Sequence, residues 1–406
     1  MTKVSEWIQG ARQSPAAAAE VRHDILWLRA VAVEGLFCFH CSRFFDYFGW
    51  PVGGGALGSL IHALTVVLGL WVMPLLSVVR GVTAALAMWR RTARQFVRDG
   101  ARRLLPPMAL AVLVLVPPQI YLERLASSQP AGWFLVFYPS YLGAILPSGG
   151  GSGLAGTHRW YLLVLFGFSV LLVPLSLLVR SATGRRLHGR GVTPFARPAM
   201  ILSLGLPLMA LGLARRSDII GAPWLDGSSL MGYLVLFICG YLLLSNERVR
   251  AAVNEVGPYT VLLALLGTPT AVCVCSPGQV PAAGAGDCSA GLGLVAFVSW
   301  CRVLGLLHIG QCYLNRTNGT LHWLNQAVMP FYVLHQTVIV AVGYYAVQST
   351  LPAAAKYAAL WAISLAIAVA VCEFAVRRFA PLSALFGLSV VDTEEWPTSA
   401  MPAPAR

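Results

Sequence analysis

Long runs of apolar residues recur along the whole chain, separated by shorter polar or charged stretches. A helix that spans a membrane needs about 20 predominantly apolar residues, and ten runs approach this length. The runs are continuous rather than alternating, which excludes a transmembrane barrel of strands and leaves helices to satisfy the backbone groups in lipid. The pattern predicts an all-α, polytopic transmembrane helix bundle of about ten spans, at residues 25–45, 64–89, 104–122, 158–179, 198–214, 228–245, 257–275, 289–311, 324–347 and 355–376.

The composition also indicates a membrane protein. Of the 406 residues, 57% are hydrophobic and 11% are charged, whereas soluble domains carry about 25% charged residues. We expect a transmembrane domain at 25–376, between a cytoplasmic segment at 1–24 and a partly disordered, Pro-rich tail at 377–406. The apolar run at 133–146 is too short to span easily, so we expect it to lie in the membrane interface or to fold back into the bundle.

The net charge of +13 is concentrated in two Arg-rich segments, 90–103 and 180–197. If ten spans alternate, both segments face the side of the N-terminus, whereas the loops 46–56 and 276–288 on the other side contain no Lys or Arg. The positive-inside rule then places both termini in the cytoplasm, in a cell or inner membrane. This topology accounts for the basic segments without a nucleic-acid partner. The same arginines could attract membrane lipid headgroups or an anionic cosubstrate.

The nine cysteines show no spacing typical of a metal site, so we expect neither a metal nor a permanently bound cofactor. Cys275 and Cys288 flank a predicted outer loop. The outer side is oxidising for most membranes, which allows a disulfide between them, with Cys273 as a competing partner.

The first apolar run carries two ionisable residues, Arg29 and His40, eleven positions apart. Eleven steps of 100° make about three turns, so both side chains share one face of a helix, separated by a rise of roughly 16 Å. Ionisable residues inside a membrane are costly and are functional candidates by default. The pair could hold a long, anionic, thioester-bearing molecule, with its phosphates at the arginine and its reactive end at the histidine, a usual general base.

Two further histidines are candidates to bind a substrate or a donor. His158 stands at the start of the fourth apolar run, and His335 lies in the ninth run shortly after Pro330, which removes one helix hydrogen bond. The alternative for each histidine, His40 included, is polar packing between helices. No Ser-His-Asp or Cys-His arrangement and no phosphate loop can be identified. The chemistry would therefore be direct transfer with a histidine base, or the protein is not an enzyme.

The chain resembles integral-membrane acyltransferase family 3. The likeness extends over about 350 residues and begins with the first-span arginine and histidine. The other motifs are MPLLSVVRG (73–81), RRLLPP (102–107), HRWYLL (158–163), FICGYLL (237–243), MPFYVLHQ (329–336) and EFAVRRFAPLSALFG (373–387).

The resemblance implies an enzyme that takes an acyl group from cytoplasmic acyl-coenzyme A and places it on a hydroxyl of an extracytoplasmic acceptor, often a glycan. It assigns the catalytic role to His40 and the handling of the donor to Arg29, Arg102 and Arg103, and its HRWYLL motif adds Trp160 to the binding candidates. Acetyl and succinyl are the first acyl groups to consider. Two alternatives stay open: a transporter of a small anionic or lipid-linked molecule, and an inactive scaffold of a glycan-synthesis complex.

In three places the chain differs from the family's usual residues. Arg80 precedes Gly81 where a Ser-Gly pair is usual, Glu34 occupies a position that is usually apolar, and Gly100 stands where an arginine is common. Glu34 and Arg80 have opposite charges and both fall near the middle of adjacent predicted spans. We therefore expect them to form a compensating charge pair, because a single buried charge without a partner is costly.

Overall fold

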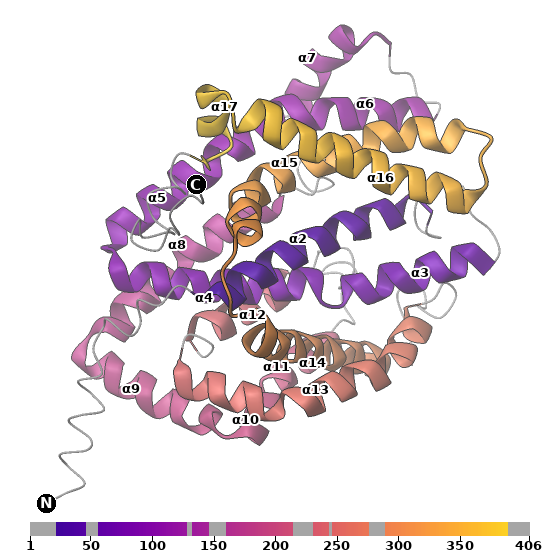
Figure 1. The fold of residues 1–406 in the computed structure, drawn as a ribbon. Helices are drawn as coiled ribbons and strands as arrows, with labels where there is room; N and C mark the ends of the chain where they lie inside the picture. The colour runs from indigo at the N-terminus through magenta and orange to yellow at the C-terminus, as the bar shows by residue number, and fades with distance from the viewer. Residues whose placement is uncertain are drawn as a thin grey trace, which may run out of the picture.

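The computed structural model describes residues 22–45, 56–127, 132–145, 160–213, 230–242, 246–275 and 289–388, and all regular secondary structure in these ranges is helical (Figure 1). The helices are α2 (His23–Arg43), α3 (Ala56–Gly69), α4 (Val72–Arg90), α5 (Ala93–Leu110), η2 (Ala111–Leu115), α6 (Val116–Ala126), α7 (Phe134–Ile145), α8 (Trp160–Arg180), α9 (Ala182–Val192), η4 (Thr193–Ala196), α10 (Pro198–Leu202), α11 (Gly205–Leu213), α12 (Leu230–Leu242), α13 (Glu247–Val274), α14 (Ser289–Tyr313), α15 (Gly319–Gln348), α16 (Ala353–Val371), η7 (Cys372–Val376) and α17 (Ala380–Leu385).

The described helices confirm an integral, multi-pass membrane protein. Seven of them are long and apolar enough to cross a membrane: His23–Arg43, Gly58–Met88, Ala93–Ala126, Glu247–Val274, Gly291–Tyr313, Gly319–Gln348 and Ala353–Val376. The predicted fifth span corresponds to Pro198–Leu213, which forms a helix pair with Arg190–Ala196, bent by 106° between the two. The predicted fourth and sixth spans contain the shorter apolar helices Val164–Arg180 and Leu230–Leu242. All ten apolar runs thus contain helix, while the number of spans and the side of the termini stay predictions.

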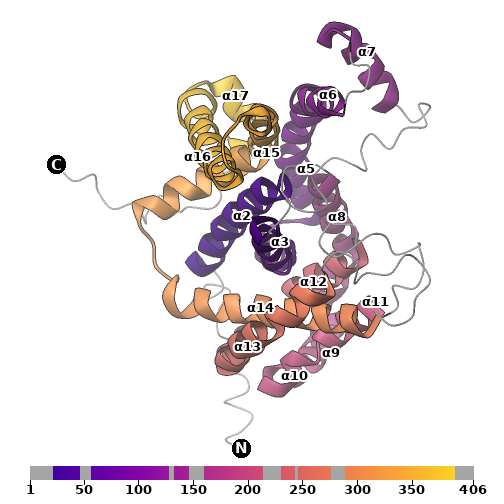
Figure 2. The ribbon, with the colours of Figure 1, turned by 90° about the vertical axis from the view of Figure 1, so that its right-hand side faces the viewer.

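Helix α2 lies in the centre of the bundle (Figure 2). It contacts α3, α4, α14, α15 and α16, and its aromatic and aliphatic side chains belong to the main hydrophobic core. Helices α15 and α16 cover one side of α2, and α13 and α14 lie on the other (Figures 1 and 2). The predicted Arg29 and His40 therefore lie on a helix with neighbours on several sides, where a side chain can be held from several directions.

Helices α4 and α12 cross at very short distance because each has a glycine at the crossing. A Cβ atom on Gly81 would overlap the Phe237 carbonyl oxygen, and a Cβ atom on Gly240 would overlap the Val78 carbonyl oxygen. Small residues of this kind let transmembrane helices pack backbone against backbone. The motifs MPLLSVVRG and FICGYLL, far apart in the sequence, thus meet at one contact.

We expect Gly81→Ala to lower the stability of the bundle by about 1–3 kcal/mol, the usual cost of an overpacked contact. Gly167→Ala on α8 is the matched control, because open space surrounds that glycine and alanine favours a helix over glycine. Thermal unfolding in detergent measures both variants. Equal melting temperatures for Gly81→Ala and the control would show that the crossing is not as close as described.

The candidate span Gly58–Met88, made of α3 and α4, contains a break at Leu70 and Trp71. Helix α14 satisfies the carbonyl groups that the break leaves open. Arg302 donates to the Val67 carbonyl at 3.3 Å and also to the Thr268 hydroxyl, and Ser299 donates to the Leu70 carbonyl at 2.5 Å. A cation at the carboxyl end of a helix is favourable, so Arg302 has a structural role here.

The apolar run at 133–146 forms the short helix α7, which packs against α6 and η2 at the edge of the bundle (Figure 2). The π-helical segment η2 leaves carbonyl groups without their usual α-helical partners. The hydroxyls of Tyr138 and Tyr141 donate to the carbonyls of Leu113 and Val112, at 2.9 and 2.7 Å. Trp133, the residue before α7, keeps 83% of its surface exposed, which suits a helix at the membrane interface.

Candidate active site

His40 and His335, both candidates from the sequence, lie beside each other between α2 and α15. Their ring centroids are 5.4 Å apart, with planes inclined by 38°. Both side chains are buried, with 5% and 2% of their surface exposed. Almost 300 residues separate them in the sequence, so the packing of α2 against α15 creates this histidine pair.

The surroundings of His335 fix its orientation. Its ring stacks on Phe331, with centroids 6.1 Å apart and planes inclined by 9°. Its Nδ1 atom lies 2.7 Å from the Tyr332 carbonyl oxygen. A carbonyl oxygen can only accept, so Nδ1 carries the proton and the lone pair of a neutral ring lies on Nε2. His335 is thus prepared to accept a hydrogen bond through Nε2.

Arg29 lies three turns from His40 on α2, and its guanidinium donates to the side-chain oxygen of Asn325 on α15. Asn325 precedes His335 by ten residues, nearly the spacing of Arg29 and His40 on α2. Helices α2 and α15 therefore run side by side in the same direction, with a polar contact at each end. The two contacts are separated by about 15 Å of helix rise.

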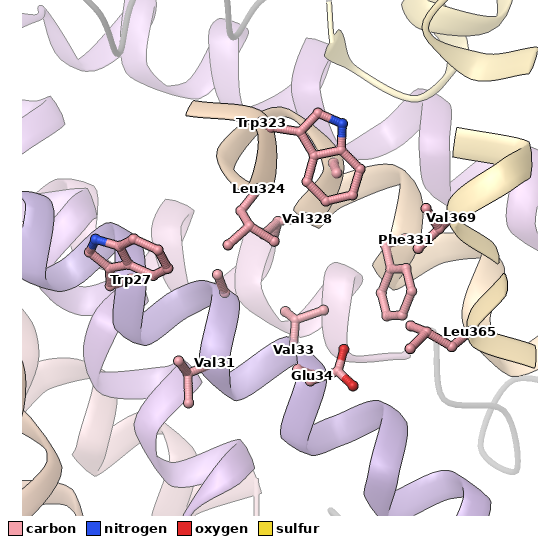
Figure 3. A pocket seen from close by; sticks show the side chains of 12 residues that line it. Trp27, Val31, Val33, Glu34, Trp323, Leu324, Val328, Phe331, Leu365 and Val369 are labelled. Atoms are coloured by element: carbon pink, nitrogen blue, oxygen red, sulfur yellow. The ribbon is translucent and has the colours of Figure 1, made fainter. Parts of the chain in front are cut away.

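A groove of about 370 Å³ lies between α2, α15 and α16 (Figure 3). It is lined by residues 27–34 of α2 and 323–331 of α15. Its walls are apolar except for Glu34, whose carboxylate points into it (Figure 3). The lining residues are Trp27, Ala30, Val31, Val33, Glu34, Trp323, Leu324, Ala327, Val328, Phe331, Leu365 and Val369. Phe331 also stacks on His335, so the groove extends toward the histidine pair.

The two tryptophans that line the groove are held by hydrogen bonds at its Arg29 end. The Trp27 indole donates to the Arg316 carbonyl at 3.0 Å, and the Trp323 indole donates to Glu373 Oε2 at 3.0 Å. Arg377 fixes this carboxylate with an ion pair of 2.6 Å. Both indole N–H groups thus have partners, while both residues line the groove.

A polar cluster on α15 and η7 surrounds Glu373. Arg377 donates to Gln326 Oε1 at 2.8 Å, and the Gln326 amide lies 3.0 Å from His322 Nε2. The π-helical turn of η7, Cys372–Val376, contains Glu373, and such turns are frequent at functional sites. The cluster comes from the closing motif EFAVRRFAPLSALFG, which therefore supports Trp323 at this end of the groove.

The structure does not bring Glu34 and Arg80 together as the predicted charge pair. Among the described residues, the recorded polar contact of the Glu34 carboxylate is the Cys38 thiol at 3.9 Å, and no ion pair joins it to Arg80. Gly35 packs against Trp71 at the start of α4, so Glu34 lies at that depth. Arg80 lies eight residues further along α4 than Val72, about 12 Å along its axis. The sequence cannot give this stagger between the two helices.

The predicted donor-binding residues Arg102 and Arg103 lie on α5, away from the histidine pair. Arg102 is exposed and Arg103 half-buried on α5, which starts with a capping box between Thr92 and Gln95. The Arg103 backbone packs beside Gly387, the last residue of the closing motif, so this arginine lies at the end of the bundle that holds η7.

The remaining candidates lie at the edges of the described ranges. His158 and Cys288 lie outside the described residues, and Trp160 is the first residue of α8, with its side chain not described. The disulfide between Cys275 and Cys288 therefore stays a prediction. His308, another intramembrane histidine, contacts Asn254 at 3.1 Å, which is polar packing between α14 and α13.

Sequence reasoning missed Asn325, Trp27 and Trp323. The repeat of a polar residue and a histidine about three turns apart, first in α2 and again in α15, is the signal that could have identified Asn325. Within the described ranges, no three His, Cys, Asp or Glu side chains gather as a metal site would require.

Comparison with known proteins gives one match. A family model described as an acyltransferase domain, that of acyltransferase family 3, matches residues 22–375. This range contains Arg29, both paired histidines, the groove and Glu373. No curated protein and no solved structure matches the chain.

Proposed function

Because this chain belongs to acyltransferase family 3 and is a membrane-bound acyltransferase, we propose that it moves an acyl group from acyl-coenzyme A to a hydroxyl group of an extracytoplasmic acceptor. The observation that carries the proposal is the buried pair of His40 and His335, with Arg29 three turns away on the same helix. An arginine can bind two phosphate oxygens at once with its planar guanidinium. One end of the site thus suits the phosphates of the donor and the other suits proton transfer.

In the proposed reaction, His40 accepts the proton of the acceptor hydroxyl as general base. The hydroxyl oxygen attacks the thioester carbonyl, a new C–O bond forms, and the C–S bond breaks. The proton held by His40 passes to the departing thiolate, which leaves as free coenzyme A. His335, with its lone pair on Nε2, positions the hydroxyl or the thioester beside His40. No covalent acyl-enzyme is required, because the two substrates meet at the same base.

The inner arginines extend the donor site. Arg102 and Arg103 follow the basic first turns of α5, and we assign them to the phosphates of the nucleotide and to anionic lipid headgroups. Acetyl and succinyl are the proposed acyl groups. The motifs look most like those of glucans biosynthesis protein C, which favours a glycan as the acceptor.

The test is to incubate the purified protein with labelled acetyl- or succinyl-coenzyme A and an envelope extract, and to identify the product that carries label. The proposal predicts label in an ester bond on a hydroxylated envelope component, together with release of stoichiometric free thiol. Movement of the intact donor without thiol release would favour a transporter. If the protein neither transfers the acyl group nor transports the donor, the inactive scaffold is the function that remains.

A further inference from the structure

The groove between α2, α15 and α16 has a definite direction. On α2 it extends from Trp27 to Glu34, seven residues or about 10 Å, and on α15 from Trp323 to Phe331, eight residues or about 12 Å. Arg29 lies near its tryptophan end, and Phe331 at its other end stacks on His335. The groove therefore runs beside the contact of α2 with α15, from the level of Arg29 to Phe331, the residue that stacks on His335.

We infer that this groove binds the pantetheine arm of the donor, with Glu34 as the residue that fixes it. The inference rests on the proposed function and assigns a site to the middle of the donor. The arm is slender and largely apolar, and it carries two amide groups. Its hydrocarbon parts match the valine, leucine and alanine walls, and an amide N–H can donate to the Glu34 carboxylate.

The position of Glu34 argues for an occupant with a hydrogen-bond donor. Among the described lining residues, Glu34 is the charged one, and its carboxylate points into the groove rather than toward a cation (Figure 3). A polar group placed in an apolar site is costly unless a partner satisfies it. The amide of a pantetheine arm supplies such a partner when the donor binds.

The main competitor for the groove is a lipid hydrocarbon chain. Val31 lines the groove and keeps 40% of its surface exposed, so the groove is accessible from the side of α2. A hydrocarbon chain would fill the volume but would leave the Glu34 carboxylate without a donor. The two tryptophans, whose indole N–H groups are already bonded, offer ring surfaces at the end where the nucleotide of the donor would enter.

The experiment measures the affinity of coenzyme A and of adenosine 3′,5′-bisphosphate, the nucleotide part alone, for the purified full-length protein. Ala327→Phe fills the groove from α15, and Val31→Trp fills it from the exposed side if the first variant folds poorly. We expect each to weaken coenzyme A binding about tenfold or more, because the arm loses its site, and to leave the nucleotide fragment unaffected. Ala366→Phe on the exposed side of α16 is the control and should change neither affinity.

Glu34 is tested in the same assay. Glu34→Leu should weaken coenzyme A binding about tenfold, whereas Glu34→Gln, which keeps a carbonyl acceptor, should lose much less. Unchanged coenzyme A binding in both groove-filling variants, or equal loss for coenzyme A and the nucleotide fragment, would overturn the assignment and favour lipid in the groove. A wild-type protein that binds no coenzyme A would overturn the proposed function as well.

Discussion

Replacing His40 with alanine is expected to lower turnover by about 10²–10⁴-fold while the protein stays folded. The histidine is the proposed base, and water cannot replace it readily because only 5% of the side chain is exposed. The initial rate of label transfer from acyl-coenzyme A measures the effect, and the melting temperature in detergent monitors the fold. A truncated buried side chain always costs some stability, so the two readouts have to be compared.

His308→Ala serves as the matched control for His40→Ala. His308 is also an intramembrane histidine, but its contact is Asn254 on α13, away from the groove and from His335. We expect its turnover to stay close to that of the wild type. A folded His40→Ala protein with undiminished turnover would exclude His40 as the base, whatever the behaviour of the control.

Arg29→Ala is expected to weaken binding of the acyl donor by about 10–100-fold. This appears as a higher KM for acyl-coenzyme A with a smaller change in kcat. Hydrogen bonds between a charged guanidinium and phosphate are each worth about 1.5–3 kcal/mol. Arg29→Lys keeps the charge but loses the planar fork, so it should recover only part of the affinity. Steady-state kinetics over a range of donor concentrations measures all three proteins.

The control for Arg29 is Arg248→Ala, an exposed arginine in the first turn of α13. It lies outside the groove, so its removal tests whether any loss of basic charge raises KM. A KM in Arg29→Ala no higher than in Arg248→Ala would remove Arg29 from the donor site. Asn325, which accepts from Arg29, would then be regarded as a packing partner only.

The helical membrane fold could be predicted from the sequence because hydrophobic runs of about 20 residues directly reflect the thickness of a bilayer. The shared face of Arg29 and His40 could be derived for a similar reason, since helix geometry fixes directions within one segment. The contact of His40 with His335 could not, because it depends on the rotation and stagger of α2 against α15. The same missing information explains the error about Glu34 and Arg80, two charges of similar assumed depth on helices staggered by about two turns.

Local features also divide into those that the sequence predicts and those that depend on the packing of helices. The capping box at Thr92 is a sequence signature of a helix start, whereas the break at Leu70 is understood only once Arg302 and Ser299 are seen to satisfy its carbonyls. Glu34 stood out in the sequence as an unusual residue. Its location in a groove bounded by Trp27 and Trp323 required the packing of three helices.

The central claim is that an acyl group is transferred across the membrane while coenzyme A stays on the donor side. The most direct measurement uses vesicles that contain the purified protein in one known orientation, with doubly labelled acyl-coenzyme A on the cytoplasmic side and the acceptor on the other side. We expect the acyl label to appear on the acceptor while the coenzyme A label stays behind as free thiol, and we expect His40→Ala to slow both by about 10²–10⁴-fold. Appearance of both labels together on the acceptor side would contradict the central claim and would show transport of the intact donor.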